Sequence, residues 1–484
     1  MSDDTKSNSE LICWVDDESE VEWDVKVDLL VIGAGGCGLI AGLVAAQQGA
    51  QVLIVEKETV AGGNTSLGQG MFPAVGSALQ KEAGIDDTPE LMTEDILAKN
   101  HHESDPEMTR NVVSHTGRLV DWLRDTEGIE LELVTNFLYP GHSRHRIHAP
   151  KTTKGSWLVN KLIEASYRYD NIDIAYAATA QRLIADRADG AVLGAEVEIR
   201  GIGLNRARAA KTILALSGFG ANKEMIHQYI PEMENAYYFG HEGNSGEGIL
   251  WGEALGAELI NMGAYQAHGS VAHPHGALVT WAVISLGGYQ VNRNGRRFVN
   301  EDHGYSEHAL DVLAQEGEVA IEIFDKRIFD EVKGYDDFQQ CVEMGAIKSF
   351  GSIEDLADYF QLDRAELHKT HDAFQRAANN QAKDPLGRTH FIAPLQPPYY
   401  GVQVTGALFH TQGGLKVDKK ARVVKKNGEL VPNLFAGGGT AVGFSGSKVS
   451  GYLSANGLLA ALTLGLLAGE EACRTITARN SSEK

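Results

Sequence analysis

The sequence predicts an α/β fold built on a buried parallel sheet, and three stretches near its start lead to this prediction. VDLLVIG (27–33) is apolar and β-branched, as a strand covered on both faces requires. An apolar helical segment follows a glycine-rich turn and reaches about Gln48, and AQVLIVEKE (50–58) is typical of a second strand. In this order the three parts form a Rossmann-like strand–helix–strand unit.

The turn of this unit carries glycines at the spacing that a dinucleotide needs. Gly33, Gly35 and Gly38 fit G-x-G-x-x-G, and Glu56 ends the second strand. The glycines allow close approach of a pyrophosphate, the helix N-terminus stabilises that anion, and the carboxylate can accept from a ribose hydroxyl. We therefore predict dinucleotide binding, with a purely structural turn as the alternative. The residues expected to contact the dinucleotide here are Gly33, Ala34, Gly35, Gly36, Cys37, Gly38, Glu56 and Lys57.

Length and charge narrow the class of protein. With 484 residues the chain is long for one core, so we expect two domains. The formal net charge of −22 disfavours binding to nucleic acid or to anionic membrane surfaces. The four cysteines lack C-x-x-C spacing and the histidines match no metal motif, so no metal, haem or iron–sulfur site is expected. The polar, acidic start and the absence of a long apolar run favour a soluble cytoplasmic protein without membrane insertion.

A second glycine-rich segment, AGGNTSLGQG (61–70), suits a chain that lies against a pyrophosphate or a flavin edge, although a flexible linker has the same composition. With other blocks along nearly the whole chain it resembles the fumarate reductase/succinate dehydrogenase flavoprotein superfamily (FAD-binding type 2), which includes the 3-ketosteroid dehydrogenases. Those blocks are WDVKVDLLVIGAGG, ILALSGFGANKEM, NSGEGILWGEALGAEL, HTQGGLKVDKKARVV, LFAGGG and NGLLAALTLGLLAG.

The resemblance implies FAD as the cofactor. Covalent members of the superfamily attach the flavin through a histidine near the second glycine-rich segment. This sequence has Asn64-Thr65-Ser66 there, so non-covalent FAD is expected. The N-terminus of the last helix should face the flavin and stabilise its reduced anion. The cofactor contacts that the resemblance adds are Gly62, Gly63, Asn64, Thr65, Ser66, Gly68, Gly70, Ala180, Ser217, Gly218, Gly438, Gly439, Asn456 and Leu458.

The resemblance also implies an α+β cap domain for the substrate, inserted into the FAD-binding domain. The expected divisions are a tail at 1–24, FAD-binding parts at 25–269 and 404–475, the cap at 270–403 and a tail at 476–484. Within them, apolar periodicity predicts a helix at 105–128 and strands at 172–186 and 191–198. VKKNGEL (424–430) predicts a hairpin turn.

Two histidines occupy motif positions that imply chemistry. In this superfamily a hydride moves between the flavin and one carbon, and a proton moves at the neighbouring carbon, which needs a polarised oxygen nearby. His268 in YQAHGS resembles the Q-x-H that contacts substrate, and is a candidate donor to the activating oxygen. His410 in FHTQGGL resembles the H-T-x-G-G histidine that lies over the flavin. A structural histidine and a turn residue are the respective alternatives.

Three departures from the fumarate reductases point away from a dicarboxylate. TWAVI (280–284) places Trp281 and Ile284 where those enzymes keep a proton-relaying Glu and Arg. RRFVNEDHGYSEH (296–308) places Tyr305 where they keep a catalytic Arg, and their second clamping Arg has no clear counterpart near Lys448. A dicarboxylate needs such cations.

Tyr305 resembles instead the tyrosine that takes the α proton in 3-ketosteroid Δ1-dehydrogenases. A phenol has a reference pKa of about 10. As a base it needs nearby donors or positive charge, for which His268 and His303 are candidates. The ketone-binding loop of those enzymes is replaced by FSGSK (444–448), and Ser445, Ser447 or the following Tyr452 are the candidate substitutes.

The sequence therefore predicts an FAD-dependent dehydrogenase or reductase of CH–CH groups, nearer the 3-ketosteroid Δ1-dehydrogenases than the dicarboxylate reductases. The expected substrate is a cyclic ketone, such as a ketosteroid or an oxocyclohexane compound, and electrons pass to or from an external partner. The predicted catalytic residues are Tyr305, His268, His410 and Tyr452. Two alternatives stay open: a fumarate-type enoate reductase that uses His410 and Lys448, and an FAD subunit that needs a partner chain.

Two charged stretches are given structural or open interpretations. Arg296, Arg297 and Glu301 are expected to shape the loop before Tyr305 rather than to react. The basic cluster GHSRHRIHAP (141–150) is interpreted as a solvated loop, with an anion or cofactor contact as the alternative.

Overall fold

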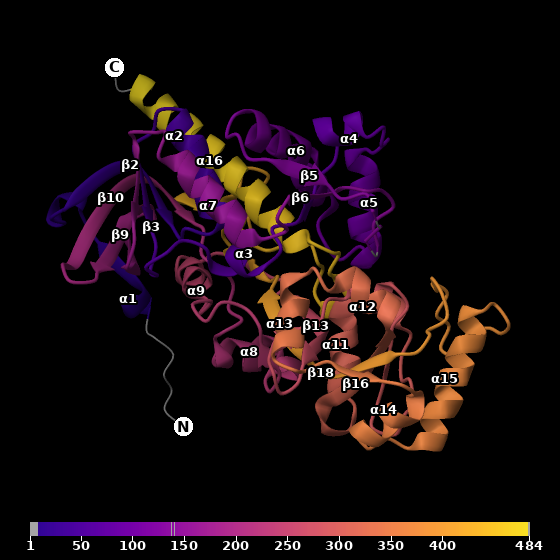
Figure 1. The fold of residues 1–484 in the computed structure, drawn as a ribbon. Coiled ribbons are helices and arrows are strands. Elements are labelled where there is room, and N and C mark those ends of the chain that lie inside the picture. The colour runs from indigo at the N-terminus through magenta and orange to yellow at the C-terminus, as the bar shows by residue number, and fades with distance from the viewer. Residues whose placement is uncertain (1–7, 137, 140, 483–484) are drawn as a thin grey trace. The chain divides into compact units, whose positions relative to one another are not determined.

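The computed structural model describes residues 8–136, 138–139 and 141–482. The chain divides into two compact units, each with a hydrophobic core of its own (Figure 1). Unit 1 takes the described residues up to Ile230, then Gly240–Tyr265 and those from His410 onward. Unit 2 takes Pro231–Phe239 and Gln266–Phe409, so it is inserted into unit 1 in the sequence.

Unit 1 contains a nine-stranded sheet of order β1-β8-β9-β10-β2-β3-β7, with β21 beside β10 and β20 beside β21. β10, β2, β3, β7 and β21 pair in parallel, whereas β8, β9 and β10 form an antiparallel meander. The strands are β1 (Ile12–Val15), β2 (Val25–Ile32), β3 (Val52–Val55), β7 (Ile172–Ala175), β8 (Ala178–Asp186), β9 (Val192–Ile199), β10 (Gly203–Leu214), β20 (Arg422–Val424) and β21 (Leu430–Ala436). Two smaller sheets join β4 (Phe72–Pro73), β6 (Ile147–Pro150) and β5 (Leu131–Leu133), and β12 (Leu259–Ile260) and β19 (Gly414–Leu415).

Two helices of unit 1, α2 and α16, lie against each other along their length (Figure 1). A Cβ on Gly465 would lie 2.4 Å from the Cys37 carbonyl oxygen, and one on Gly469 would lie 2.6 Å from that of Ala41. Bare glycine backbone is therefore what lets the two helices approach. The helices of unit 1 are α1 (Asn8–Leu11), α2 (Gly36–Gln47), α3 (Gly63–Leu67), α4 (Ala78–Glu82), α5 (Pro89–Lys99), α6 (Pro106–Asp125), α7 (Gly155–Ser166), α8 (Lys223–Tyr229), α9 (Glu247–Ala254) and α16 (Asn456–Ser482).

Unit 2 is an α+β body on a seven-stranded sheet of order β14-β13-β18-β16-β15, with β11 and β17 also paired to β18. Its central strand β16 is buried at every residue, and Phe324, Phe338 and Phe374 fill the core between sheet and helices. The strands are β11 (Tyr237–Tyr238), β13 (Tyr265–Ala272), β14 (Ala277–Leu278), β15 (Tyr289–Val291), β16 (Val319–Asp325), β17 (Lys348–Phe350) and β18 (Tyr399–Thr411). The helices are α10 (Ala282–Ser285), α11 (Tyr305–Leu313), α12 (Lys326–Val332), α13 (Asp336–Glu343), α14 (Ile353–Phe360) and α15 (Arg364–Ala378).

Several elements follow the sequence-based expectations. The strand–helix–strand unit is β2–α2–β3, the predicted long helix is α6, and VKKNGEL forms the turn between the antiparallel strands β20 and β21. The predicted strand at 172–186 is broken into β7 and β8 at Ala177, whose φ is 50°.

Both expected tails differ from the structure. Residues 12–15 form β1, which pairs in parallel with β8, and Ile12 is buried. At the other end α16 continues through Ser482. Unit 2 is also wider than the expected cap at 270–403, because β13 and β18 carry it to Gln266 and Phe409.

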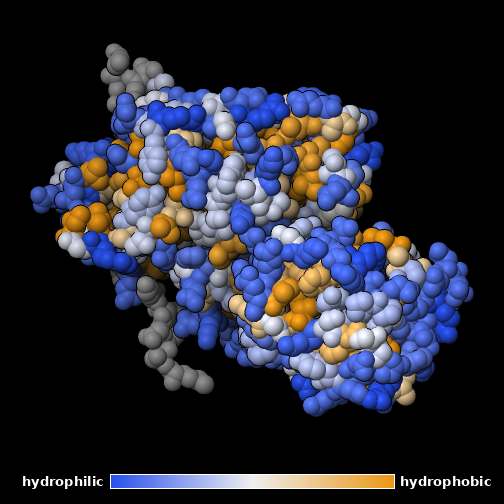
Figure 2. Space-filling model, in the orientation of Figure 1, coloured by the Kyte–Doolittle hydropathy of each residue, from blue (hydrophilic) through white to orange (hydrophobic). Residues whose placement is uncertain are grey.

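Hydrophilic side chains predominate on the face shown in Figure 2, and hydrophobic ones form separate small patches. Within residues 8–136, 138–139 and 141–482, no helix combines the length and the apolar character needed to cross a bilayer.

Candidate active site

The first glycine-rich turn of unit 1 is held by close backbone contacts. Gly33 has a φ of 107°, and a Cβ there would lie 2.7 Å from the Ala215 carbonyl oxygen. A Cβ on Gly38 would lie 1.9 Å from the Gly33 oxygen. These two positions need glycine because the turn passes between β10 and the first turn of α2. Gly35 precedes α2 and is not crowded in this way, since a Cβ there would lie 3.6 Å from the Gly62 oxygen.

Glu56 lies at the carboxyl end of β3, next to this turn. Its Oε2 accepts from the Ala34 amide at 2.8 Å and its Oε1 from the Glu58 amide at 3.0 Å. A carboxylate that is held by two backbone donors still has lone pairs left on each oxygen. The geometry fits an acceptor that is oriented in advance for ribose hydroxyls.

The second glycine-rich segment folds onto the first. Gly62 pairs with Gly35 in an isolated bridge, and Thr65 Oγ1 accepts from the Gly36 amide at 3.1 Å. Gly62 and Gly63 have φ values of 154° and 52°, which turn the chain into α3. The predicted contacts 62–70 therefore lie beside the predicted contacts 33–38.

Asn64 connects this segment by hydrogen bonds to the loop at residues 241–244, which the sequence did not predict to be part of the site. Its Oδ1 accepts from the His241 amide at 2.7 Å and from Asn244 Nδ2 at 2.9 Å. Lys57 extends to the same loop, with its Nζ 2.5 Å from the Gly243 oxygen and 3.1 Å from Glu247. Lys57 is therefore engaged with protein groups. The glycines and small polar residues of NSGEG were the available signal for this loop.

Two further predicted loops meet at the carboxyl ends of β10 and β21. A Cβ on Gly439 would lie 2.4 Å from the Gly218 nitrogen, and one on Gly218 would lie 1.9 Å from Thr411 Oγ1. Thr440 Oγ1 lies 3.3 Å from the Ser217 oxygen. Ligands of open α/β sheets bind at this edge of the sheet. The glycines here bring the two loops close together, and their lack of side chains would let a dinucleotide approach the backbone.

Asn456 begins α16 and is the clearest sign of a missing partner. It is completely buried, yet neither Nδ2 nor Oδ1 has a hydrogen-bond partner within the part of the chain that the structure describes. Orphaned buried amide atoms are costly and native proteins rarely keep them. The residues present thus fit FAD, with Asn456 and the N-terminus of α16 available to its flavin end.

Three predicted cofactor contacts have side chains that pack against other parts of unit 1, and their contact with a cofactor stays a prediction. The Cys37 side chain packs near Gly437, and burial raises the pKa of its thiol to about 12, so only its backbone is available to a cofactor. Ala180 in β8 and Leu458 in α16 pack against the core of unit 1.

His410 and Tyr452 lie together in unit 1. Their ring centroids are 5.5 Å apart in an edge-to-face arrangement. Burial lowers the pKa of His410 to about 4 and raises the pKa of Tyr452, so both are neutral near pH 7. The Tyr452 hydroxyl accepts from the Gly457 amide at 3.4 Å, at the start of α16. Both residues can therefore act as hydrogen-bond donors, but not as charges.

The loop FSGSK between them does not provide a buried cation. Phe444 and Ser445 are buried, whereas Lys448 is exposed. Glu103 accepts from the Ser447 amide at 2.8 Å and from its hydroxyl at 2.6 Å. Lys448 is thus an exposed cation of this loop, and its use by the fumarate-type alternative stays a prediction.

Unit 2 contains a cluster of aromatic rings centred on His268. Tyr305 is stacked on the imidazole at 5.0 Å, and Trp281 meets it edge-on at 5.7 Å. Phe409 lies 5.5 Å from the same ring and is itself stacked on Phe239 at 4.9 Å. The structure brings the predicted pair His268 and Tyr305 together. The two phenylalanines were missed, since they are 170 positions apart in the sequence and Phe409 only precedes the H-T-x-G-G motif.

His268 is a neutral donor rather than a cation. Burial, and then the nearby His308, lower its pKa to about 3. Its Nδ1 accepts from the Ser270 amide at 3.1 Å, so the single ring proton of neutral His268 is on Nε2. Of the two contributions expected from His268, a hydrogen-bond donor or positive charge, its neutrality leaves the donor, and the other candidate, His303, is exposed. What His268 offers is an N–H group.

A buried polar network lies behind His268. Glu322 Oε2 accepts from Ser270 Oγ at 2.7 Å and from Gln290 Nε2 at 2.8 Å, and Gln290 Oε1 lies 2.8 Å from His308 Nε2. Gln290 and Glu322 are cross-strand neighbours on β15 and β16. Burial raises the pKa of Glu322 to about 7. The network fixes the strand from which His268 projects.

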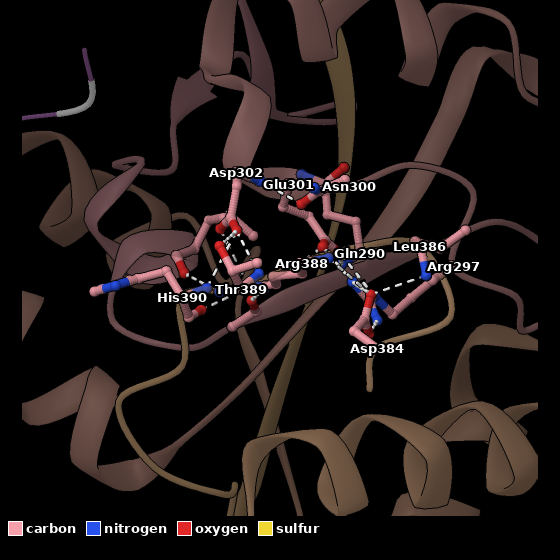
Figure 3. Close-up of polar contacts among 12 residues, drawn as sticks. Gln290, Arg297, Asn300, Glu301, Asp302, Asp384, Leu386, Arg388, Thr389 and His390 are labelled. Carbon is pink, nitrogen blue, oxygen red and sulfur yellow. Dashed lines mark hydrogen bonds and ion pairs between the residues drawn. The ribbon is translucent and has the colours of Figure 1, made fainter. Parts of the chain in front are cut away.

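The charged residues before Tyr305 form a buried scaffold, shown in Figure 3. Arg297 pairs with Glu301 at 2.6 Å and with Asp384 at 2.5 Å. Arg388 donates to the carbonyl oxygens of Gly288 and Ile284 and lies 3.6 Å from Glu301. Asp302 accepts from the amides of residues 389 and 390. As expected, Arg297 and Glu301 shape this loop, whereas Arg296 is largely exposed.

The basic segment 141–150 is not a solvated loop, and that interpretation is wrong. Arg146 is completely buried and pairs with Asp87 at 2.9 Å and Asp95 at 2.5 Å. His142 is buried with Nε2 3.1 Å from the Ser454 oxygen, just before α16. Its Nδ1 has no partner among the described residues, so a contact to a ligand stays open.

A profile of the FAD binding domain family matches residues 28–453. The chain belongs to this family. Over 451 residues it is 30% identical to a fumarate reductase (cytochrome) of Shewanella frigidimarina, covering 93% of this chain and 77% of that protein. The open conformation of a flavocytochrome c3 fumarate reductase superposes with a TM-score of 0.79 and 26% identity, over 94% of this chain and 79% of the other.

The 3-ketosteroid-Δ4-(5α)-dehydrogenase of Rhodococcus jostii RHA1, solved with 4-androstene-3,17-dione, superposes with a TM-score of 0.75 and 25% identity. That match covers 94% of this chain and 98% of the other. The protein is therefore an FAD-dependent oxidoreductase of the CH–CH class. The identity is higher to the fumarate reductase, at 30%, than to the 3-ketosteroid dehydrogenase, at 25%, while the TM-scores of 0.79 and 0.75 show one fold for both.

Proposed function

We propose that this flavoprotein dehydrogenates a carbon–carbon bond beside the carbonyl of a cyclic ketone, such as a ketosteroid or an oxocyclohexane compound, or reduces it in reverse. The observation that carries the proposal is the ring cluster of unit 2, where Tyr305 is stacked on neutral His268 and Trp281 flanks both. One phenol and one imidazole N–H among apolar rings suit an apolar substrate with a single polar oxygen.

The chemistry divides between cofactor and protein. FAD, which we propose to be bound non-covalently, supplies hydride transfer. Tyr305 in its phenolate form is proposed to take a proton from the α carbon, which returns it to the neutral phenol, while the hydride that leaves the neighbouring carbon would be accepted by FAD. The substrate is left with a C=C bond. His268 is proposed to donate Nε2–H to the carbonyl oxygen and so acidify the α C–H bond. His410 and Tyr452 are proposed as additional donors.

Three cations that belong to the motif segments or contact them do not form a buried clamp for a carboxylate. Arg297 pairs with the carboxylates of Glu301 and Asp384. Arg388 donates to two backbone carbonyl oxygens and lies near Glu301, and Lys448 is exposed. A dicarboxylate needs a bidentate clamp, for which arginine is best suited. These assignments favour a ketone over two carboxylates.

A second candidate is an enoate reductase of the fumarate type. The 30% identity to the fumarate reductase of Shewanella frigidimarina favours it. In that case the charge of the substrate would be held largely by neutral donors such as His268 and His410, which predicts weak binding of fumarate.

The experiment is anaerobic stopped-flow spectroscopy of the holoprotein. Oxidised protein is mixed with saturated cyclic ketones, ketosteroids and succinate, and photoreduced protein with the matching enones and fumarate. Flavin bleaching by a ketone, or faster reoxidation by its enone than by fumarate, supports the proposal. Faster reoxidation by fumarate than by every enone contradicts it. Adding a redox dye then tests the electron partner: steady turnover with substrate and dye alone shows that no partner chain is needed.

A further inference from the structure

We infer that Gln412 and Ser445 are positioning residues that fix the tautomer of His410. All three belong to unit 1: His410 is near the end of β18, Gln412 follows that strand, and Ser445 lies in the loop after η5 (Gly438–Thr440). The inference deepens the proposed function, because it rests on His410 acting as a donor. It concerns how that donor is held.

The three side chains form a continuous hydrogen-bonded chain. Gln412 Nε2 lies 3.0 Å from His410 Nδ1, and Gln412 Oε1 lies 3.1 Å from Ser445 Oγ. An amide nitrogen only donates, so Nδ1 must accept. The carbonyl oxygen only accepts, so Ser445 must donate to it, which orients the amide. The Thr411 oxygen is also near Nδ1, but at 3.4 Å it is the longer contact.

Packing leaves this chain little room to rearrange. Gln412 and Ser445 are 5% and 1% exposed. A Cβ on Gly443 would lie 2.3 Å from Gln412 Oε1, and one on Gly457 would lie 2.9 Å from His410 Nε2. The side chains of Gln412 and His410 thus occupy space that is free because residues 443 and 457 are glycines. The Gln412 side-chain amide lies between the Gly443 backbone and the Ser445 hydroxyl.

The consequence is a histidine with one available role. Burial keeps His410 neutral near pH 7, and a neutral imidazole whose Nδ1 accepts carries its proton on Nε2. Nε2 is therefore an obligate donor. A carboxylate at position 412 would do the opposite, since it can only accept and would draw the proton to Nδ1. Gln412, at the variable position of HTQGG, is thus the residue that keeps the proton of His410 on Nε2 and makes that nitrogen a donor.

The test measures the tautomer itself. The holoprotein is labelled with 15N in histidine only, and solid-state 15N spectra are recorded, in which protonated and unprotonated ring nitrogens are well separated. Loss of signals in His410→Gln assigns the residue. We expect an unprotonated Nδ1 in the wild type, a protonated Nδ1 in Gln412→Glu, and a mixture in Ser445→Ala, where the amide is free to turn. Gln48→Glu, an exposed site with the same change of charge, serves as the control and should match the wild type.

Turnover is then measured on the same variants with FAD bound. Gln412→Glu should lower kcat about 10²- to 10³-fold, as expected for loss of one donor to a developing oxyanion. A protonated Nδ1 at His410 in the wild type, once His410→Gln has assigned its signals, overturns the inference. An unchanged His410 spectrum in Gln412→Glu also overturns it. If the tautomer switches while turnover is unchanged, the positioning holds and the proposed role of His410 in the reaction fails.

Discussion

Replacing Tyr305 with Phe removes one hydroxyl group from the ring cluster of unit 2. Because phenylalanine keeps the ring, the stack on His268 at 5.0 Å and the edge contact with Trp281 at 6.2 Å are both retained. Tyr305 is half-buried at the first position of α11, so the fold should tolerate the change. The variant therefore isolates proton transfer from packing.

The expected loss follows from what the hydroxyl does. Positioned general acid–base catalysis contributes about 10²- to 10⁴-fold in rate, which corresponds to ~3–5 kcal/mol of transition-state stabilisation. His268 stays neutral with its proton on Nε2 and cannot act as the base, since its Nδ1 is occupied by the Ser270 amide. We expect flavin reduction by the ketone substrate to slow by that factor, while binding of the substrate changes little.

The assay is single-turnover reduction of the bound flavin under anaerobic conditions, with the flavin spectrum as the measure of FAD content. Tyr335→Phe is the matched control, because Tyr335 also belongs to unit 2 but lies outside the cluster and is 37% exposed. A Tyr305→Phe protein that keeps its FAD and reduces it at the wild-type rate would refute the assignment of Tyr305 as the acid–base.

Three other predictions concern stability and cofactor binding. Arg297→Met removes the only ion-pair partner that the structure gives the buried carboxylate of Asp384 among the described residues and leaves Glu301 with Arg388 at 3.6 Å. It should lower the free energy of unfolding by about 3–5 kcal/mol in urea, whereas Arg296→Met, at a largely exposed pair, should cost less than about 1 kcal/mol. Asn456→Ala should weaken FAD binding about 10- to 100-fold in titrations of the apoprotein, because its unpartnered amide atoms are those left for the cofactor; unchanged affinity would contradict this. Burial lowers the pKa of His371 to about 4, so from about pH 7 to 4 the unfolded chain binds a proton there that the folded chain does not. The free energy of unfolding should therefore fall as the pH falls, by ~2 kcal/mol between about pH 7 and 5 for this residue. His371→Gln should remove this contribution to the pH dependence of the free energy of unfolding. The control His368→Gln, at an exposed position of the same helix, should leave that contribution in place.

The parts of the fold that the sequence predicts are those with local causes. The β2–α2–β3 unit follows from a β-branched run, glycines and an acidic strand end within a short stretch, and the β20–β21 turn follows from Asn427-Gly428. In contrast, β1 is only four residues long and is stabilised by pairing with β8, far along the chain. No local pattern distinguishes it from a tail.

The residues of the candidate site also fall into those with local sequence signals and those that depend on distant contacts. His268 and Tyr305 were predicted from motifs, but their ring partner Phe409 and the protonation of His268 depend on distant contacts. Arg146 shows the limit most clearly: the four residues before it, His142 to His145, are polar or basic, yet Asp87 and Asp95 neutralise it inside unit 1. Composition alone favours a solvated loop there, and tertiary pairing reverses it.

The strand β18 has a consequence for how such proteins can be recombined. Phe409 belongs to unit 2 and His410 to unit 1, although they are consecutive residues of one strand. Successive residues of a strand point to opposite faces, so the insertion or deletion of a single residue here would exchange the faces of all that follow. A chimaera that borrows unit 2 from a relative should therefore be joined without changing the strand's length. Where a junction in this strand must change its length, only an even number of residues keeps the following side chains on their original faces.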